Sequence, residues 1–299
     1  MSAFTTVRVP ASSANLGPGF DTLGLALAIH LECRFRPAEQ LEITLSGRDT
    51  AGIPADSSNL IWQTAVQVAE AQGRTMPPVR LEVHNEIPLG KGLGSSAAAL
   101  TAGVAIANGA LGLGWDEHRV LDEAARIEGH PDNVAAAVLG SITTAAIGAD
   151  GVTRAIRLEI PDSFSIAVVC PDFELATKGM RGVLPKCYSR EDTIFNLQRA
   201  TLLVAALATG TKDVFPDALF DRLHQPYRMH SVPGMKEILE LRAPGLLGCA
   251  MSGAGPSMLV LFETGREDVV ELVRAEFEKA GKRAEAMFPT IDRDGLRVE

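Results

Sequence analysis

Residues 88–98 read Pro88-Leu89-Gly90-Lys91-Gly92-Leu93-Gly94-Ser95-Ser96-Ala97-Ala98. An alternating segment, residues 79–84, precedes this stretch, and a run of small residues follows it, which predicts a strand, a glycine loop and a helix in succession. Glycines let backbone N–H groups approach an anion closely, and the first turn of a helix adds unpaired N–H groups. With the charge of Lys91 and two serine hydroxyls, the stretch predicts a phosphate-binding loop.

Two other phosphate-binding folds fit the stretch poorly. A P-loop requires Gly-Lys followed directly by Ser or Thr, and this tripeptide does not occur in the chain. Residues 92–97 fit the dinucleotide pattern G-x-G-x-x-A, but the preceding strand is amphipathic, whereas a central parallel strand is apolar throughout. The acids at the expected distance, Asp116 and Glu117, begin a helix rather than end a second strand. Both interpretations are therefore disfavoured.

Two further segments identify a family. Residues 10–21 read Pro10-Ala11-Ser12-Ser13-Ala14-Asn15-Leu16-Gly17-Pro18-Gly19-Phe20-Asp21, and residues 248–258 read Gly248-Cys249-Ala250-Met251-Ser252-Gly253-Ala254-Gly255-Pro256-Ser257-Met258. Together with the glycine loop, they resemble the three motifs of the GHMP small-molecule kinases, in the family's order. The first motif resembles that of the homoserine kinases in particular, because Ser13-Ala14-Asn15-Leu16-Gly17 is followed by Gly19-Phe20-Asp21.

The resemblance implies an α+β fold of two domains with the site between them. The N-terminal domain would resemble ribosomal protein S5 domain 2, and the C-terminal domain would be ferredoxin-like. A turn cluster at residues 148–151 suggests the boundary, since a β-α-α-β-α order follows it. We therefore expect an ATP-binding domain over residues 1–150 and a C-terminal GHMP kinase domain over residues 151–299.

Hydrophobic periodicity predicts the secondary structure along the chain. We expect serines 57 and 58 to cap the first helix, and Gly73 to end it. The predicted strands include residues 7–9, 41–45, 142–147, 166–170, 246–250 and 258–262, and the predicted helices cover residues 59–72, 116–128, 132–139, 193–209, 236–242 and 267–280.

The activity implied by the resemblance is the transfer of the γ-phosphoryl group of MgATP to the side-chain hydroxyl of L-homoserine. The product would be O-phospho-L-homoserine, on the path to threonine. Two alternatives stay open: a GHMP kinase for another alcohol, such as mevalonate or a sugar, and a metabolite-binding relative without catalysis. The second alternative predicts loss of Ser96, Glu128 or the third-motif glycines, and all of them are present.

Phosphoryl transfer needs a site for the triphosphate, a bridging metal and a positioned acceptor hydroxyl. The resemblance assigns the phosphates of ATP to residues 88–98, with Gly253 and Gly255 of the third motif. It assigns Mg²⁺ to Ser96 and Glu128, and hydroxyl and carboxylate oxygens are ligands that Mg²⁺ prefers. Glu128 also ends a predicted helix, where an acid is unfavourable by a few tenths of a kcal/mol, and this mismatch favours a functional role.

The acceptor hydroxyl has three candidate neighbours. The resemblance places Asp132 and Asn133 against the acceptor, and it places Thr177 near the transferred phosphate. No general base is obvious, and Asp132 is the candidate if one is used. Five histidines are candidate proton shuttles, and none is assigned: His84, His118, His130, His224 and His230.

The charged ends of homoserine need complementary side chains. Guanidinium groups bind carboxylates through two parallel hydrogen bonds, and the resemblance assigns the carboxylate to Arg181 and Arg228. It assigns the ammonium and the flanking atoms to Asn15 and Asp21. A buried Asp21 needs a cationic partner, and the substrate ammonium is expected to supply it.

Composition limits the partners of this chain of 299 residues. A net charge of −9 argues against nonspecific nucleic-acid binding, which depends on basic patches. The four cysteines form no C-x-x-C pair, which favours reduced thiols over a zinc site or a disulfide framework. No apolar stretch approaches the roughly 20 residues of a membrane span, nor does a signal-peptide core occur. We expect a cytoplasmic enzyme, and a homodimer is compatible with the sequence.

Overall fold

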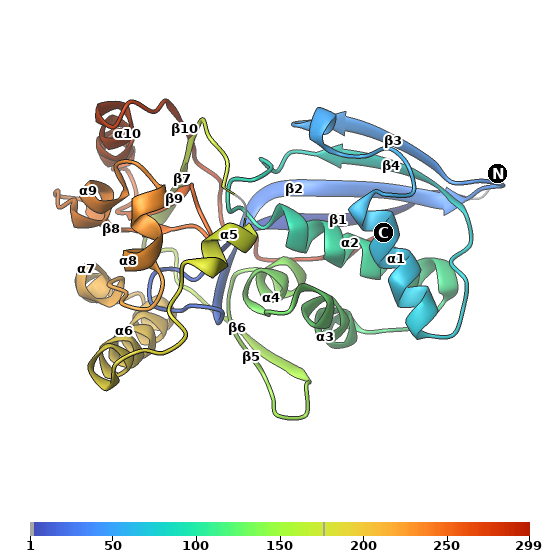
Figure 1. The fold of residues 1–299 in the computed structure, drawn as a ribbon, viewed down its shortest axis with the longest axis horizontal. Coiled ribbons are helices and arrows are strands. Elements are labelled where there is room, and N and C mark those ends of the chain that lie inside the picture. The colour runs from blue at the N-terminus through green and yellow to red at the C-terminus, as the bar shows by residue number, and fades with distance from the viewer. Residues whose placement is uncertain (1–2, 176) are drawn as a thin grey trace.

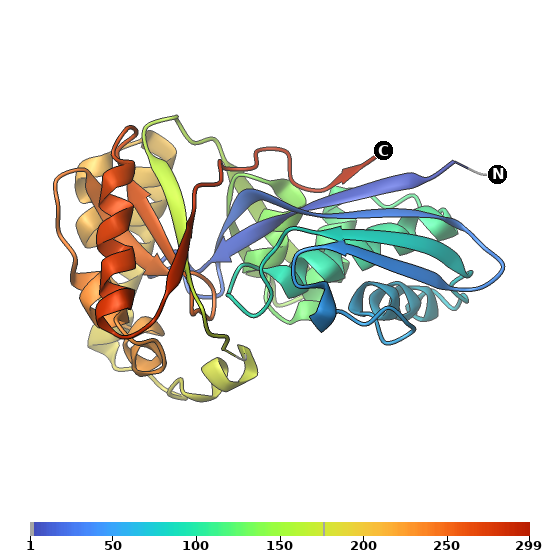
Figure 2. The same cartoon turned by 90° about the horizontal axis from the view of Figure 1, so that it is seen from above.

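The computed structural model describes residues 3–175 and 177–299, without the side chains of residues 177 and 178. Figures 1 and 2 show an elongated molecule, with a larger sheet and helices α1 to α4 in one half and a smaller sheet with helices α6 to α10 in the other. The larger sheet has seven strands and the smaller one four. This arrangement confirms the expected α+β class with two sheets.

The seven-stranded sheet is mainly antiparallel. Its main path runs β11-β1-β2-β4-β3, with β3 parallel to β4, while β5 pairs with both β2 and β6. Its strands are β1 (Thr5–Ala14), β2 (Leu23–Pro37), β3 (Glu42–Gly47), β4 (Val79–Asn85), β5 (Ile142–Ile147), β6 (Thr153–Leu158) and β11 (Arg297–Val298). The helices of this half are α1 (Leu60–Ala71), α2 (Ser95–Leu111), α3 (Glu117–Glu128) and α4 (Asp132–Leu139).

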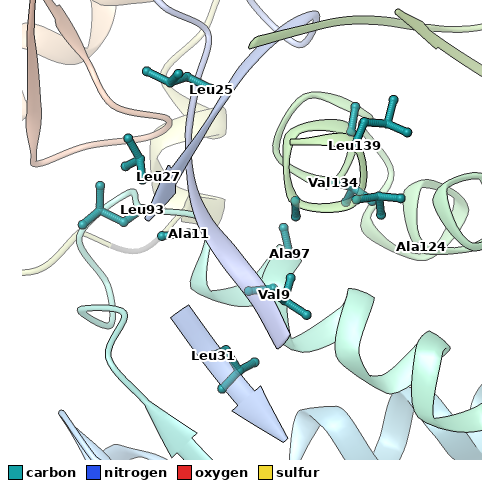
Figure 3. Close-up of a cluster of buried hydrophobic side chains, with 14 of the residues drawn as sticks. Val9, Ala11, Leu25, Leu27, Leu31, Leu93, Ala97, Ala124, Val134 and Leu139 are labelled. Atoms are coloured by element: carbon teal, nitrogen blue, oxygen red, sulfur yellow. The ribbon is translucent and has the colours of Figure 1, made fainter. Parts of the chain in front are cut away.

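Helix α2 is buried along most of its length, which explains its run of small residues. Gly103 lies tightly against α1, since a Cβ there would lie 2.6 Å from both the Ile61 carbonyl oxygen and the Thr64 Cβ. Figure 3 shows Val9 and Ala97 in the same apolar cluster. The core therefore fixes the start of α2, where the glycine loop ends.

The four-stranded sheet is antiparallel, with the order β10-β7-β9-β8. Its strands are β7 (Ser165–Pro171), β8 (Leu246–Met251), β9 (Met258–Phe262) and β10 (Ala284–Met287). The helices of this half are α6 (Arg190–Thr209), α7 (Phe215–Ala218), α8 (Gln225–Arg228), α9 (Met235–Glu240) and α10 (Val270–Lys279), and α5 (Thr177–Gly182) precedes them in the chain. Phe262 and Phe277 lie in a second apolar core, which includes both sheet and helix residues.

The helix start predicted at the serines was wrong. The side chain of Asn59 accepts the Ile61 N–H at 3.0 Å and caps α1. The Ser58 hydroxyl instead donates to Asp56 at 2.6 Å. Asn and Ser cap helices about equally well, so the pattern alone could not distinguish the two positions.

The turn at residues 148–151 lies within the larger sheet, because it joins β5 to β6, and these two strands pair with each other. The C-terminal strand β11 also returns to this sheet and pairs with β1. The sheet therefore includes residues on both sides of the boundary expected from the sequence. We infer that the first domain ends after Leu158 and also includes the C-terminal tail, the segment after β10 that carries β11.

Asp292 fastens this tail to the larger sheet. One carboxylate oxygen lies 2.7 Å from His30 Nε2 and 3.1 Å from Arg297 Nη2. The other oxygen accepts the N–H groups of Asp294 and Gly295 at 3.0 and 2.8 Å. Burial opposes ionisation, but the hydrogen bonds from His30 and the backbone outweigh it and lower the pKa of Asp292.

Asp292→Asn is expected to lower the free energy of unfolding by about 1–3 kcal/mol, because a buried charged acceptor is lost. A carboxylate with a lowered pKa stabilises the fold above its unfolded pKa of about 3.9, and this contribution disappears as the pH falls through the folded pKa. Urea unfolding at pH 7 and pH 3 should therefore show a larger difference at pH 7 than at pH 3. Asp294→Asn, at an exposed neighbour, is the control, and equal losses in both variants would contradict the account.

Candidate active site

The glycine loop lies against the third motif. Gly90, Gly92 and Gly94 have φ values of 66°, 74° and 67°, in the left-handed region that favours glycine. A Cβ on Gly92 would collide with the carbonyl oxygens of Ser252 and Gly255, which belong to the turn between β8 and β9. Close packing against this turn therefore requires a residue without a side chain at Gly92. A phosphate-binding loop has the same requirement.

The loop ends at the N-terminus of α2. Gly94 occupies the N-cap position and supplies no side-chain cap, and the N–H of Ala98 makes a hydrogen bond to its carbonyl at 2.9 Å. The three residues before Ala98, residues 95–97, line a pocket. First-turn N–H groups and the positive end of the helix dipole thus face this pocket, as an anion requires.

Lys91 does not line the pocket, and its contact with the phosphates stays a prediction from the sequence. Its Nζ donates to the carbonyl oxygens of Pro171 and Phe173 at 2.9 and 2.8 Å, which ties the loop to the end of β7. Of the predicted phosphate-binding residues in the described chain, Pro88, Leu89, Lys91, Ala98 and Gly255 lie outside the pocket lining.

The pocket is lined by residues that are far apart in the sequence. The first motif contributes Asn15, Phe20 and Asp21, and the third contributes Gly253 and Ala254. The other lining residues are Gly90, Gly92, Leu93, Gly94, Ser95, Ser96, Ala97, Glu128, His130, Asp132, Asn133, Leu175, Arg181 and Arg228. All predicted metal and substrate residues with described side chains therefore meet at one site.

An acidic cluster lies at the end of α3 and the start of α4. His130 Nδ1 is 2.6 Å from an oxygen of Asp132, and its Nε2 is 3.9 Å from Glu128. Burial disfavours the charged imidazole, but the hydrogen bond and charge of Asp132, with the charge of Glu128, raise the pKa of His130. Burial is also the main cause that raises the pKa of Glu128, against the charge of His130 and the hydroxyl of Ser96.

Sequence reasoning left His130 without a role, although it lies in the pocket between two assigned carboxylates. The only signal available was its position between Glu128 and Asp132. Ligand atoms of Asp21, His130 and Asp132 also lie within 4.8 Å of one another. A cation is disfavoured at that set, because the guanidinium of Arg181 already pairs with Asp21.

Asp21 and Arg181 bind each other, which differs from the expectation. The two guanidinium nitrogens of Arg181 donate to the two carboxylate oxygens of Asp21 at 3.0 and 2.7 Å. The Asp21 side chain is 32% exposed rather than buried, so it does not depend on a ligand for its cationic partner. The residues predicted for opposite ends of the substrate thus neutralise one another.

Arg228 is only 2% exposed and is held by the protein on one edge. Its Nε donates to the Met180 carbonyl at 3.1 Å, and its Nη1 lies 3.2 Å from both the Gly253 carbonyl and the ring of His224. Burial and the nearby charge of Arg181 lower its pKa, against the charge of Asp21. The side chain nevertheless lines the pocket.

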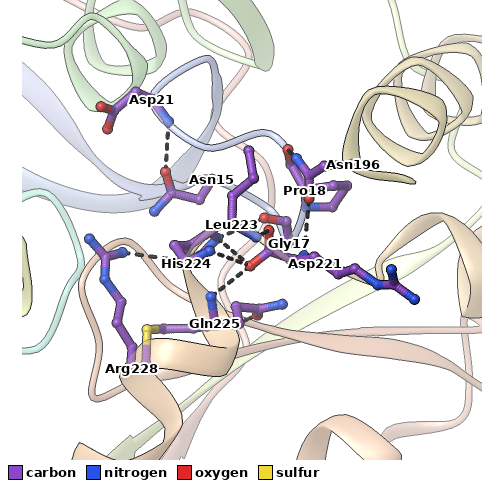
Figure 4. Close-up of polar contacts among 12 residues, drawn as sticks. Asn15, Gly17, Pro18, Asp21, Asn196, Asp221, Leu223, His224, Gln225 and Arg228 are labelled. Atoms are coloured by element: carbon purple, nitrogen blue, oxygen red, sulfur yellow. Dashed lines mark hydrogen bonds and ion pairs between the residues drawn. The ribbon is translucent and has the colours of Figure 1, made fainter. Parts of the chain in front are cut away.

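Asn15 connects the first and third motifs, and Figure 4 shows its contact with Asp21. Its amide nitrogen donates to the Gly253 carbonyl at 2.9 Å, and its carbonyl oxygen accepts the backbone N–H of Asp21 at 3.0 Å. Asn15, Leu16 and Asp21 all have positive φ values, of 73°, 47° and 55°. Such strained non-glycine residues cluster at functional sites.

The predictions that Asn133 and Thr177 lie near the acceptor hydroxyl and the transferred phosphate have different outcomes. Asn133 lines the pocket, and its side-chain oxygen accepts a hydrogen bond from Ser12 at 2.9 Å. Ser12 is a site neighbour that sequence reasoning did not assign. The side chain of Thr177 lies outside the described residues, so its place near the phosphate stays a prediction.

Within residues 3–175 and 177–299, no helix has the length and apolar character that crossing a membrane requires.

Residues 59–141 match the GHMP kinases N terminal domain, and residues 203–282 match the GHMP kinases C terminal domain.

Two curated proteins and one solved structure are similar over nearly the whole chain. The homoserine kinase of Solibacter usitatus is 63% identical, over 98% of this chain and 96% of its own. The homoserine kinase of Deinococcus radiodurans is 49% identical, over the same two shares. The crystal structure of homoserine kinase from Cytophaga hutchinsonii has a TM-score of 0.86 at 26% identity, covering 100% of this chain and 98% of that one.

Proposed function

Because this chain belongs to the homoserine kinases of the GHMP kinase family, we propose that it phosphorylates L-homoserine at the pocket described above. The reaction uses ATP and yields ADP and O-phospho-L-homoserine. The observation that carries the site assignment is the position of two arginines, Arg181 and Arg228, in the same pocket as the N-terminus of α2. One end of this pocket suits phosphates and the other suits a carboxylate.

The phosphates of ATP are assigned to the N–H groups at the start of α2 and to Gly92 and Gly94. The residues present also fit Mg²⁺, because Ser96 and Glu128 offer hard oxygens in the pocket, and a buried carboxylate gains from a nearby cation. When bound, the metal would offset the negative charge that develops during phosphoryl transfer. Ser96 and Glu128 would hold the metal near the N-terminus of α2.

The zwitterionic end of homoserine is assigned to the two arginines, Asp21 and Asn15. Arg181 and Asp21 carry the charges that complement the carboxylate and the ammonium of the substrate. Substrate binding therefore replaces one ion pair within the protein by two ion pairs between the protein and the substrate. The carboxylate replaces Asp21 as a partner of Arg181, and the ammonium replaces Arg181 as a partner of Asp21. A neutral sugar brings no charges for this exchange, so it gains neither of the two new ion pairs.

The acceptor hydroxyl is assigned to the side of the pocket that carries Asp132 and Asn133. Its oxygen forms a bond to the γ-phosphorus while the bond from that phosphorus to the β–γ bridging oxygen breaks. One Asp132 oxygen is engaged by His130 and the Asn133 N–H, at 2.6 and 2.7 Å. Asp132 is the carboxylate placed to take the hydroxyl proton. Homodimerisation and a cytoplasmic location stay predictions from the sequence.

The proposed function is tested by identifying the product. The purified protein is incubated with MgATP and L-homoserine, and phosphorus NMR and mass spectrometry are recorded on the mixture. We expect one equivalent of ADP for each phosphate ester on the homoserine side chain. ADP with free phosphate and unchanged homoserine would contradict the proposal.

Activity is expected to depend strictly on a divalent cation, and Glu128→Gln is expected to lower kcat by about tenfold or more, since a charged metal ligand is lost. Initial rates against Mg²⁺ concentration measure both effects, and thermal melting checks the fold. Glu117→Gln, at the exposed start of the same helix, is the matched control. Full activity of Glu128→Gln would remove this residue from the metal site.

A further inference from the structure

His224 lies directly behind the substrate arginine and is fully buried. Its Nε2 is 2.7 Å from the carbonyl oxygen of Gly17, in the first motif, and its Nδ1 is 3.2 Å from Nη1 of Arg228 (Figure 4). The ring therefore bridges two segments that are 207 residues apart in the chain.

The partners of the ring fix its proton. A guanidinium has only donors, so Nδ1 must accept from Arg228 and carries no hydrogen. The Gly17 carbonyl has only lone pairs, so Nε2 must donate to it. The ring is thus the neutral Nε2–H tautomer. Burial, with the charge of Arg228, lowers the pKa of His224 against the charge of Asp221, which agrees with a neutral ring.

Neighbouring groups leave the ring little freedom. Asp221 accepts the N–H groups of Leu223, His224 and Gln225 at 2.8, 3.0 and 2.6 Å, which fixes the backbone before α8. Phe20 stacks on the imidazole with ring centroids 5.2 Å apart and planes inclined by 25°. The same Phe20 ring has the guanidinium carbon of Arg228 5.3 Å from its centroid.

Arg228 is consequently held along one edge. Met180, Gly253 and His224 together accept from Nε and Nη1, and they belong to three separate segments. Among the described residues, Nη2 has no hydrogen-bond partner, while the side chain lines the pocket. Of these acceptors, His224 is the one supplied by a side chain.

We propose that His224 is a positioning residue for substrate binding: its Nδ1 holds the guanidinium of Arg228 so that one nitrogen stays free for the carboxylate of the amino acid. This role rests on the proposed function. His224 does not line the pocket, so it is expected to act on the affinity for homoserine through Arg228 rather than on the transfer step.

Two isosteric variants separate the functions of the two ring nitrogens. In His224→Asn the side-chain oxygen can replace Nδ1 as the acceptor from Arg228, but the bond to Gly17 is lost. In His224→Gln the amide nitrogen can replace Nε2 as the donor to Gly17, but the bond to Arg228 is lost. Both substitutions are expected to lower thermal stability, but only His224→Gln removes the hydrogen bond to Arg228.

Steady-state kinetics on purified full-length protein is the test. His224→Gln is expected to raise the KM for homoserine about tenfold, the worth of one hydrogen bond to a charged group, with the KM for ATP and kcat little changed. His224→Asn is expected to stay within about threefold of wild type. His30→Gln, which removes a buried histidine outside the pocket lining, controls for lost stability alone.

Equal changes in KM for the two His224 variants, or a loss of kcat with an unchanged KM, would overturn the role. If the wild type itself does not phosphorylate homoserine, the proposed function fails first and this role fails with it. Nitrogen NMR of the wild-type imidazoles tests the proposal without any variant. An Nε2–H tautomer for His224 is expected at pH 6, and an Nδ1–H tautomer would contradict it.

Discussion

Gly94→Val is expected to weaken ATP binding by about a hundredfold or more, as measured by isothermal titration. A Cβ at this position would collide with the hydroxyl oxygen of Ser12, and the φ value of 67° is strained for a β-branched residue. The loop must then move away from the first turn of α2, and each lost N–H contact to phosphate costs about 1.5–3 kcal/mol. Affinity for homoserine should change much less, because its charged ends are assigned to other segments.

The matched control lies at the other end of the same helix. Gly112 has a similar φ of 59°, but a Cβ there would meet nothing within 4 Å. Gly112→Val therefore suffers the same backbone strain without blocking the loop, and it should lose stability but keep ATP affinity. If Gly94→Val binds ATP normally, or if both variants lose it equally, the phosphate assignment is wrong.

Arg181→Ala and Arg228→Ala are each expected to raise the KM for homoserine by roughly ten- to a few hundredfold. The basis is the contribution of about 1.5–3 kcal/mol from each hydrogen bond to a charged group, at 1.4 kcal/mol for each tenfold change. The KM for ATP should change little. Arg228→Ala should also lower thermal stability, since the carbonyls of Met180 and Gly253 lose a buried donor.

A carboxyl-free analogue, 3-aminopropan-1-ol, provides the chemical control. It should be a poor substrate for the wild type, and the two substitutions should change its KM much less than that of homoserine. Arg222→Ala is the control variant, because Arg222 pairs with Glu191 and Asp192 and lies outside the pocket lining. A wild-type KM for homoserine in both substrate variants, or an equal loss of the analogue, would favour another alcohol as substrate.

The sequence predicted the site best where backbone chemistry decides it. Glycines at positive φ, such as Gly92 and Gly94, have few alternatives, so the residue pattern alone located the glycine loop that lines the pocket. Long side chains were predicted less well. The ammonium of Lys91 can reach several acceptors, and only the fold brings the carbonyls of Pro171 and Phe173 within 3 Å. The same holds for Asp21 and Arg181, which are 160 residues apart.

Long-range strand pairing limited the prediction of the fold. The hydrophobic pattern identified strands such as residues 142–147, but nothing local indicates that the chain returns at β11 to pair with β1. Strand β2, of 15 residues, was missed because its apolar run from Leu23 changes to alternation only later, and its pairing with β1 shifts register at Pro10. His224 lacked a signal for the same reason, since the Gly17 carbonyl that fixes its ring is 207 residues away.

The central claim is that this pocket is built for a zwitterionic amino alcohol, and substrate preference tests it most directly. Initial rates of ADP release are measured with MgATP and L-homoserine, mevalonate, shikimate or galactose, each over a range of concentrations. We expect kcat/KM for homoserine to exceed that for every other alcohol by about a hundredfold or more, because the other three lack the ammonium and galactose also lacks the carboxylate, and each charge-assisted hydrogen bond to such a group contributes about 1.5–3 kcal/mol. A comparable or higher kcat/KM for any of the other three alcohols would contradict it.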